Sequence, residues 1–121
     1  MILVDTSIWV DHFRQGTASL VSLLAKGDAI SHPFVIGELA CGSLSRRREK
    51  LAMLGRLPRA VLADHDEVLA LVEDERLMAL GIGWIDAHLL ASSLLSDAGV
   101  WTRDQGLARA ARKLGVLASE R

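Results

Sequence analysis

The strongest candidates for chemistry in this sequence are four acidic residues: Asp5, Glu38, Asp86 and Asp104. Asp5 directly follows a short apolar run at the start of the chain, and Asp104 closely follows another. Glu38 lies inside an apolar segment, and Asp86 stands at the beginning of a further apolar stretch. Burying an unpaired carboxylate is strongly unfavourable, so such side chains should face a cation, a basic partner or solvent.

Considered together, the four acids favour a metal site. Carboxylates that converge on one edge repel one another and raise each other's pKa, and a divalent cation among them would relieve this repulsion. Ligands that are all oxygen suit Mg²⁺ or Mn²⁺ rather than zinc or copper. Such an ion lowers the pKa of a bound water and stabilises the attacking and leaving oxygens in phosphoryl displacement. The pattern therefore favours metal-dependent hydrolysis of a phosphodiester.

Each acid except Glu38 also has a simple structural explanation. Asp104 is an ordinary N-cap candidate, and Asp86 could lie in a first helical turn, where the helix dipole favours an anion. Asp5 could cap a helix that begins at Thr6 or Ser7. Glu38 is the hardest to explain in this way, because its neighbours in the chain are apolar.

The acids are positioned by short apolar strands that alternate with helices. Strands are expected at 1–4, 29–30 and 100–101, with weaker candidates at 60–62 and 116–117. Helices are expected from Thr6 or Ser7, around 20–24 up to Gly27, from Ser31 or Pro33 to Gly42, and over 46–55, 64–80, 85–96 and 104–114. This alternation predicts an α/β fold, a helix-rich three-layer α/β/α sandwich with a short-stranded parallel sheet. Ligands bind at the carboxyl ends of such strands, where Asp5 and Asp104 fall.

Composition limits the class of protein. A chain of 121 residues with 50% apolar and 24% charged residues fits one domain, 1–121. The single cysteine excludes an intrachain disulfide framework, and a reducing cytoplasm is the expected location. The longest stretch without a charged residue has 11 residues, too few for a membrane span of about 20. A net charge of −1 and the absence of tyrosine argue against binding nucleic acid through bulk positive charge or an aromatic platform.

Other residues receive mostly structural interpretations. Segment 46–59 carries six basic residues against one acidic residue, and we expect mainly a solvated surface with a share of phosphate contacts. Segment 64–76 is acidic and is expected to lie on exposed helix surface away from any RNA. Cys41 and the three tryptophans are predicted to be buried packing residues.

The order of these residues resembles the PIN-domain ribonucleases, and more narrowly the VapC toxins of type II VapBC toxin–antitoxin pairs. The resemblance covers essentially the whole chain and rests on four stretches: Asp5-Thr6-Ser7-Ile8-Trp9, Glu38-Leu39, 83–91 and Trp101-Thr102-Arg103-Asp104. It implies a PIN fold, an Mg²⁺- or Mn²⁺-dependent endoribonuclease that acts on RNA, inhibition by a VapB-type antitoxin, and a homodimer. The four acids match the family's acidic quartet, a name kept below for Asp5, Glu38, Asp86 and Asp104. Ser7 and Thr102 match positions where the family often has a small hydroxyl residue near the metal.

Two other classes remain open at this stage. A magnesium-binding phosphatase or receiver-like phosphoryl-transfer domain also places acids at strand ends. However, Ser7 stands where a haloacid-dehalogenase-type phosphatase needs a second aspartate, and Arg103 is the nearest substitute for a receiver's lysine. In a non-catalytic binding module the acids would only cap helices, and magnesium would not change the stability of the protein.

Overall fold

A parallel sheet of three short strands lies at the centre of the molecule. The computed structural model describes residues 1–118. The strand order is β2 (Ala29–Ile30), β1 (Ile2–Val4) and β3 (Gly99–Trp101), with β1 in the middle. Leu3 is paired with Ile30 on one side and with Val100 on the other. These apolar runs form strands buried on both faces, as the sequence predicts for a parallel sheet.

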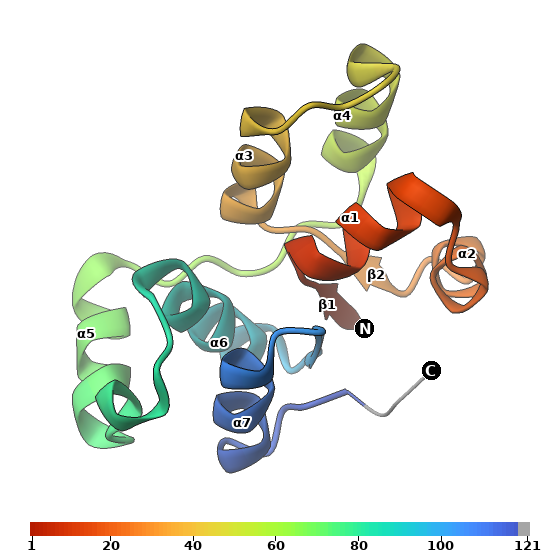
Figure 1. The fold of residues 1–121 in the computed structure, drawn as a ribbon. Coiled ribbons are helices and arrows are strands. Elements are labelled where there is room, and N and C mark those ends of the chain that lie inside the picture. The colour runs from red at the N-terminus through yellow and green to blue at the C-terminus, as the bar shows by residue number, and fades with distance from the viewer. Residues whose placement is uncertain (119–121) are drawn as a thin grey trace.

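Helices surround this sheet (Figure 1). Residues 1–118 contain seven α-helices and one 3₁₀ helix: α1 (Thr6–Gln15), α2 (Ala18–Ala25), α3 (Pro33–Cys41), α4 (Arg47–Arg56), α5 (His65–Asp74), η1 (Leu77–Leu80), α6 (Trp84–Ser96) and α7 (Gln105–Lys113). The predicted helix-rich α/β/α architecture is confirmed. No described helix has both the length and the apolar character needed to span a membrane.

The connections bring several helix N-termini together. The carboxyl end of β1 passes into α1 through Asp5, and that of β3 reaches α7 through residues 102–104. The carboxyl end of β2 leads to α3 through Ser31 and His32. Figure 1 shows the first turns of α1, α6 and α7 arranged around one region, with α3 beside it. This is the edge of the sheet at which parallel α/β folds bind ligands.

Three predicted elements differ in the structure. Residues 60–62 form no strand, because Val61 and Leu62 are about half exposed and only the neighbouring Arg59 makes an isolated bridge, to Ser31. Residues 116–117 likewise give only a bridge, between Leu117 and Val100. The helix predicted over 64–80 is two elements. It ends at Asp74, and Arg76 then adopts a left-handed conformation (φ 54°), which breaks the helical hydrogen bonding before η1.

The helix starts are close to those that the sequence predicts. α1 begins at Thr6 with Asp5 in the N-cap position, and α3 begins at Pro33 with His32 as its N-cap. A capping box precedes α5, in which Asp64 accepts from the Glu67 backbone N–H and Glu67 accepts from that of Asp64.

The burial of single residues needs two corrections. Cys41 is the last residue of α3 and is exposed rather than buried. Trp9 and Trp101 are in the core as predicted, whereas Trp84 is 39% exposed. Trp84 is the first residue of α6, at the boundary of the core, so an apolar neighbour in sequence was not enough to predict its burial.

Candidate active site

Asp5 is buried and is held by two hydroxyl groups. Its carboxylate oxygen Oδ2 accepts hydrogen bonds from Ser7 Oγ at 2.8 Å and Thr102 Oγ1 at 2.7 Å. Asp5 occupies the N-cap position of α1, but its side chain makes no capping hydrogen bond, so capping does not explain where the carboxylate points. Asp5 is 6% exposed, and its two partners come from segments that follow different strands. Its position is therefore fixed by the edge of the sheet.

Ser7 and Thr102 connect the turn after β1 with the turn after β3. Ser7 Oγ accepts from the Arg103 backbone N–H at 3.0 Å, and Thr102 Oγ1 accepts from that of Asp104 at 3.0 Å. The two hydroxyl oxygens are 3.4 Å apart. The structure thus brings both predicted supporting residues to Asp5, as expected for groups that orient a functional carboxylate.

Asp104 combines a structural role with a place at this edge. It is the N-cap of α7, and its Oδ2 accepts from the Leu107 backbone N–H at 2.8 Å. The structural explanation that the sequence suggested is therefore confirmed. Because this capping bond uses Oδ2, the other carboxylate oxygen stays available to a ligand, and the side chain is exposed.

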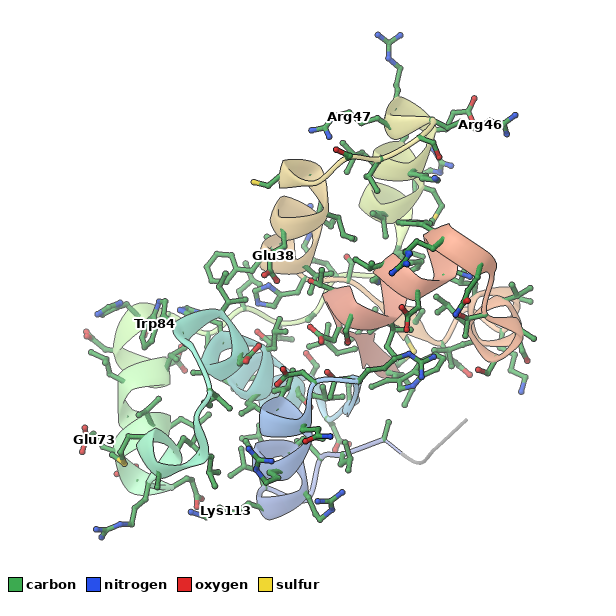
Figure 2. The ribbon with its side chains drawn as sticks, in the orientation of Figure 1. Glu38, Arg46, Arg47, Glu73, Trp84 and Lys113 are labelled. Carbon is green, nitrogen blue, oxygen red and sulfur yellow. The ribbon has the colours of Figure 1, made fainter. Side chains whose placement is uncertain are left out.

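Glu38 lies on α3 and reaches back to α1. Its Oε1 accepts from Thr6 Oγ1 at 2.9 Å, and Thr6 is the residue next to Asp5. Figure 2 shows its side chain on the side of α3 that faces the other helices rather than the outer end of the molecule. The side chain is exposed, so the burial problem that the apolar neighbours of Glu38 suggested does not arise.

The negative charges of the other three acids change the pKa of Asp86. It lies in the first turn of α6 and is partly buried. Its pKa is raised from 3.8 to about 6, first because burial removes water from the carboxylate and then because Asp5 and Asp104 are negatively charged. Glu38 raises the pKa further, while a hydrogen bond from the Gly83 backbone lowers it. The four predicted acids are therefore close enough to interact electrostatically.

The acidic quartet is close in space but is not arranged as a ready-made ligand cage. Within residues 1–118 no group of three or more His, Cys, Asp or Glu side chains already has the geometry to hold a metal ion. Carboxylates that repel one another are not drawn into contact unless a cation compensates their charge. The donor chemistry, carboxylate and hydroxyl oxygens with no thiolate, fits a hard divalent cation.

Two cavities flank Glu38. One, of about 450 Å³, lies between α1, α3 and the residues before α4, and Val10, Phe13 and Lys50 are among its lining residues. The other, of about 460 Å³, is shallow and lies between α3 and the start of α6, where Phe34 and Ile85 contribute to its wall. A carboxylate of the quartet thus stands at the border of two places where a larger ligand could extend.

Sequence reasoning missed two groups near this site. Arg103 forms an ion pair with Asp11 on α1, with 2.5 Å between Nε and Oδ2. Trp84 and Phe34 are partly exposed and belong to a row of aromatic rings that also includes histidines. Since these residues are far apart in sequence and neither group has a spacing motif, only the fold could bring them together.

The basic segment is only partly near the acids. Figure 2 shows Arg46 and Arg47 at the far end of α4, well away from Glu38. Arg47 donates to the Gly42 carbonyl, so its side chain is bound to the loop that follows α3. Lys50 is closer to the quartet, since it lines the same cavity as Glu38.

The arrangement of sheet, helices and acidic edge is that of a PIN domain, and the sequence agrees: the PIN domain profile matches residues 2–113. The chain belongs to the PIN-domain family. Within it the chain falls among the VapC proteins, because it is 46% identical over 121 residues to the ribonuclease VapC32 of two Mycobacterium tuberculosis strains. This alignment covers 99% of the chain and 98% of the relative.

Proposed function

We propose that this protein is a metal-dependent endoribonuclease toxin of the VapC kind, in which the acidic quartet forms the active site. The observation that carries the proposal is the buried Asp5 carboxylate, which two hydroxyls orient instead of a helix terminus. The raised pKa of Asp86, caused in part by Asp5, Asp104 and Glu38, supports a shared cation site. The relatives named ribonuclease VapC32 make RNA the favoured substrate.

We assign each residue of the site a role from its position and burial. Asp5 and Asp86, the less exposed acids, would hold Mg²⁺ or Mn²⁺, with Glu38 completing the site after side-chain rotation and Asp104 through its second carboxylate oxygen. When bound, such a cation neutralises charge on the scissile phosphate and lowers the pKa of a water molecule. Ser7 and Thr102 keep the Asp5 carboxylate in one orientation, and Asp104 retains its capping bond through Oδ2.

The alternative classes fit the side-chain geometry less well. A dehalogenase-type phosphatase needs a second aspartate two residues after Asp5, but Ser7 stands there and donates to Asp5. In a receiver-like domain a free cation should face the acids, whereas Arg103 is paired with Asp11. A non-catalytic module in which the acids only cap helices does not account for Asp5, because its side chain caps nothing.

The test is cleavage of total RNA by the purified protein, with Mg²⁺ or with EDTA, followed by mapping of the new RNA ends. We expect discrete internal cuts with Mg²⁺ and none with EDTA. Asp5→Asn should fold normally and lose at least about 100-fold in rate, because removing even an outer partner of a metal site costs 10–100-fold. Asp66→Asn, an exposed acid on α5, is the matched control and should cleave like the original protein. Full activity of Asp5→Asn would contradict the proposal.

The same proposal includes the oligomeric state, the cellular location and the inhibitor of the protein. We propose one domain over 1–121 that forms a homodimer in the reducing cytoplasm, with Cys41 as a free thiol. A VapB-type antitoxin would inhibit it by inserting an arginine or lysine among the acids, where the basic group replaces the cation. A structure of the inhibited complex with no basic side chain near the quartet would contradict this mode of inhibition.

A further inference from the structure

A row of aromatic rings crosses α5, α6 and the start of α3 beside the acidic quartet. His65 and Trp84 have ring centroids 5.0 Å apart, Trp84 and His88 4.7 Å, and His88 and Phe34 4.8 Å. The last pair, Phe34 and His32, is 5.2 Å apart. Rings from three segments of the chain therefore form one continuous row.

The row is rigid on its inner side and open on its outer side. His32 and His88 are 2% and 8% exposed, and His88 packs edge-on against both Trp84 and Phe34. Trp84 and Phe34 remain 39% and 38% exposed. Both rings contact His88, so two exposed aromatic faces lie on either side of one buried ring, and an exposed apolar patch of this kind favours a binding surface. Because the buried histidines hold the two outer rings, a flat ligand would bind them at little cost in side-chain entropy.

One end of this row adjoins the acidic quartet. Phe34 lines the shallow cavity of about 460 Å³ together with Glu38. Glu38 follows Phe34 by one helical turn on α3, so both lie on the same face of that helix. Trp84 contacts His88, which follows it by one turn of α6 and contacts Phe34 in turn. Figure 2 shows Trp84 at the start of α6 and Glu38 on the neighbouring α3. A ligand at Glu38 therefore lies next to Phe34, and Trp84 is the next exposed ring of the row.

The chemistry of the cavity selects the part of a nucleotide that can enter it. Glu38 is the one charged residue that contributes to the wall described, and it repels a phosphate. The remaining lining residues, Pro33, Phe34, Gly37, Cys41 and Ile85, are apolar or small, so they favour a neutral flat group. A nucleobase is the neutral flat part of RNA, and every base can stack on an aromatic ring.

We propose that Trp84 and Phe34 form a stacking subsite for an unpaired nucleobase adjoining the phosphodiester that the acidic quartet cleaves. This inference rests on the proposed ribonuclease function and adds which side chains hold a base beside the cut. A base within a duplex is already stacked between its neighbours, so it cannot use the rings without being unpaired. The lining contributes few hydrogen-bonding groups, so the subsite would accept several bases rather than one.

The kinetic test uses a single-stranded oligonucleotide that spans a mapped cleavage site, and compares KM with kcat. Trp84→Ala should raise KM about 5- to 150-fold, the range expected for the loss of one stacked base, with little change in kcat. Trp84→Phe should restore most of the affinity, because it keeps an aromatic face. Leu95→Ala is the matched control, since Leu95 is an exposed apolar residue at the other end of α6. An unchanged KM in Trp84→Ala, or equal cleavage of the annealed duplex, would overturn the proposal.

A binding test separates this inference from the proposed function. The Asp5→Asn protein in EDTA is mixed with a single-stranded hexauridylate, and tryptophan emission is recorded. Stacking should quench the exposed Trp84, and Trp84→Ala in the same background should abolish the quenching. If the original protein cleaves no RNA but this quenching occurs, the cleavage proposal fails while the subsite stands. Absence of quenching, or dissociation of a dimer in Trp84→Ala with unchanged KM, would assign the rings to another role and overturn the inference.

Discussion

At the scale of single residues, Asp86 carries much of the electrostatic cost of the acidic quartet. It is partly buried, and three other carboxylates act on it, so its pKa rises to about 6. Asp5 is more buried but has two hydroxyl donors that compensate for lost water. Two acids of the same site thus differ in their environments, and the difference predicts how each responds to substitution.

Asp86→Asn should stabilise the metal-free protein at pH 7. The pKa of Asp86 is higher in the folded state than its usual value of 3.8, so ionisation of Asp86 disfavours folding as pH rises from about 4 to 6. The amide removes this cost, and we expect a free energy of unfolding higher by about 1 kcal/mol after allowing for partial exposure of the side chain. Urea unfolding in EDTA at pH 7 and at pH 4 measures the effect.

The same experiment includes its own controls. At pH 4 the difference between Asp86→Asn and the original protein should become small, because the carboxyl group is then protonated in the folded state and partly protonated in the unfolded state. Asp66→Asn should give no such pH-dependent difference, since Asp66 is exposed on α5. A metal-free Asp86→Asn protein that is less stable at pH 7 would show that Asp86 contributes a structural bond instead.

At the scale of secondary structure, α3 begins with an unusual cap. His32 Nδ1 accepts from the Phe34 backbone N–H at 3.0 Å, and its Nε2 is 3.1 Å from Ser92 Oγ. With Nδ1 as acceptor, the neutral ring donates its Nε2 proton to Ser92. Burial, and secondarily the charge of His88, lowers the pKa of His32 to about 4. The start of the helix that carries Glu38 therefore requires an uncharged histidine.

His32→Asn should make the stability of the protein less sensitive to acid. The folded-state pKa of His32 lies below its usual 6.5, so its contribution is complete above pH 6.5 and is lost as pH falls toward 4. Between pH 7 and pH 5 this loss amounts to about 2 kcal/mol. Asparagine can accept the same Phe34 bond but does not titrate, so the variant should lack most of this loss. Urea unfolding across this range measures it, and His65→Asn, at an exposed histidine, should keep the original slope.

Most elements could be predicted from the sequence because their signals are local. The apolar run of β1 and the helix start at Asp64 depend on neighbours within a few residues, and both are confirmed. Residues 60–62 are apolar too, but they have no strand beside them with which to form a regular ladder. The early end of α5 depends on the left-handed conformation of Arg76. Arginine rarely adopts this conformation, so the sequence did not indicate that the helix ends there.

Asp5 and Asp104 could be placed at strand ends from the sequence, but the geometry of the quartet's side chains could not be predicted. That Asp5 is held by Ser7 and Thr102 depends on the pairing of β1 with β3, which joins residues 97 positions apart. The aromatic row has the same long-range origin, because Phe34 and His88 meet only after α3 packs near α6. Spacing along the chain carries no information about such contacts.

At the scale of the whole molecule, the charges are separated although their sum is only −1. Figure 2 shows Arg46 and Arg47 on α4 at the opposite end of the molecule from Glu73 on α5. The acidic quartet lies between these regions, at the sheet edge. A polyanion could therefore contact the α4 side while its scissile phosphate needs a cation to approach the acids.

Magnesium should stabilise the whole fold if the quartet binds it. The four acids come from segments on both sides of the sheet edge, so a cation that joins them links α1, α3, α6 and α7 in the folded state alone. At a concentration 100 times the dissociation constant, binding adds about 2.7 kcal/mol, which for a chain of this size raises Tm by roughly 10 °C. Thermal unfolding with increasing MgCl₂, compared with KCl at equal ionic strength, measures the shift. Asp5→Asn should flatten the titration, and a flat titration of the original protein would favour a non-catalytic binding module.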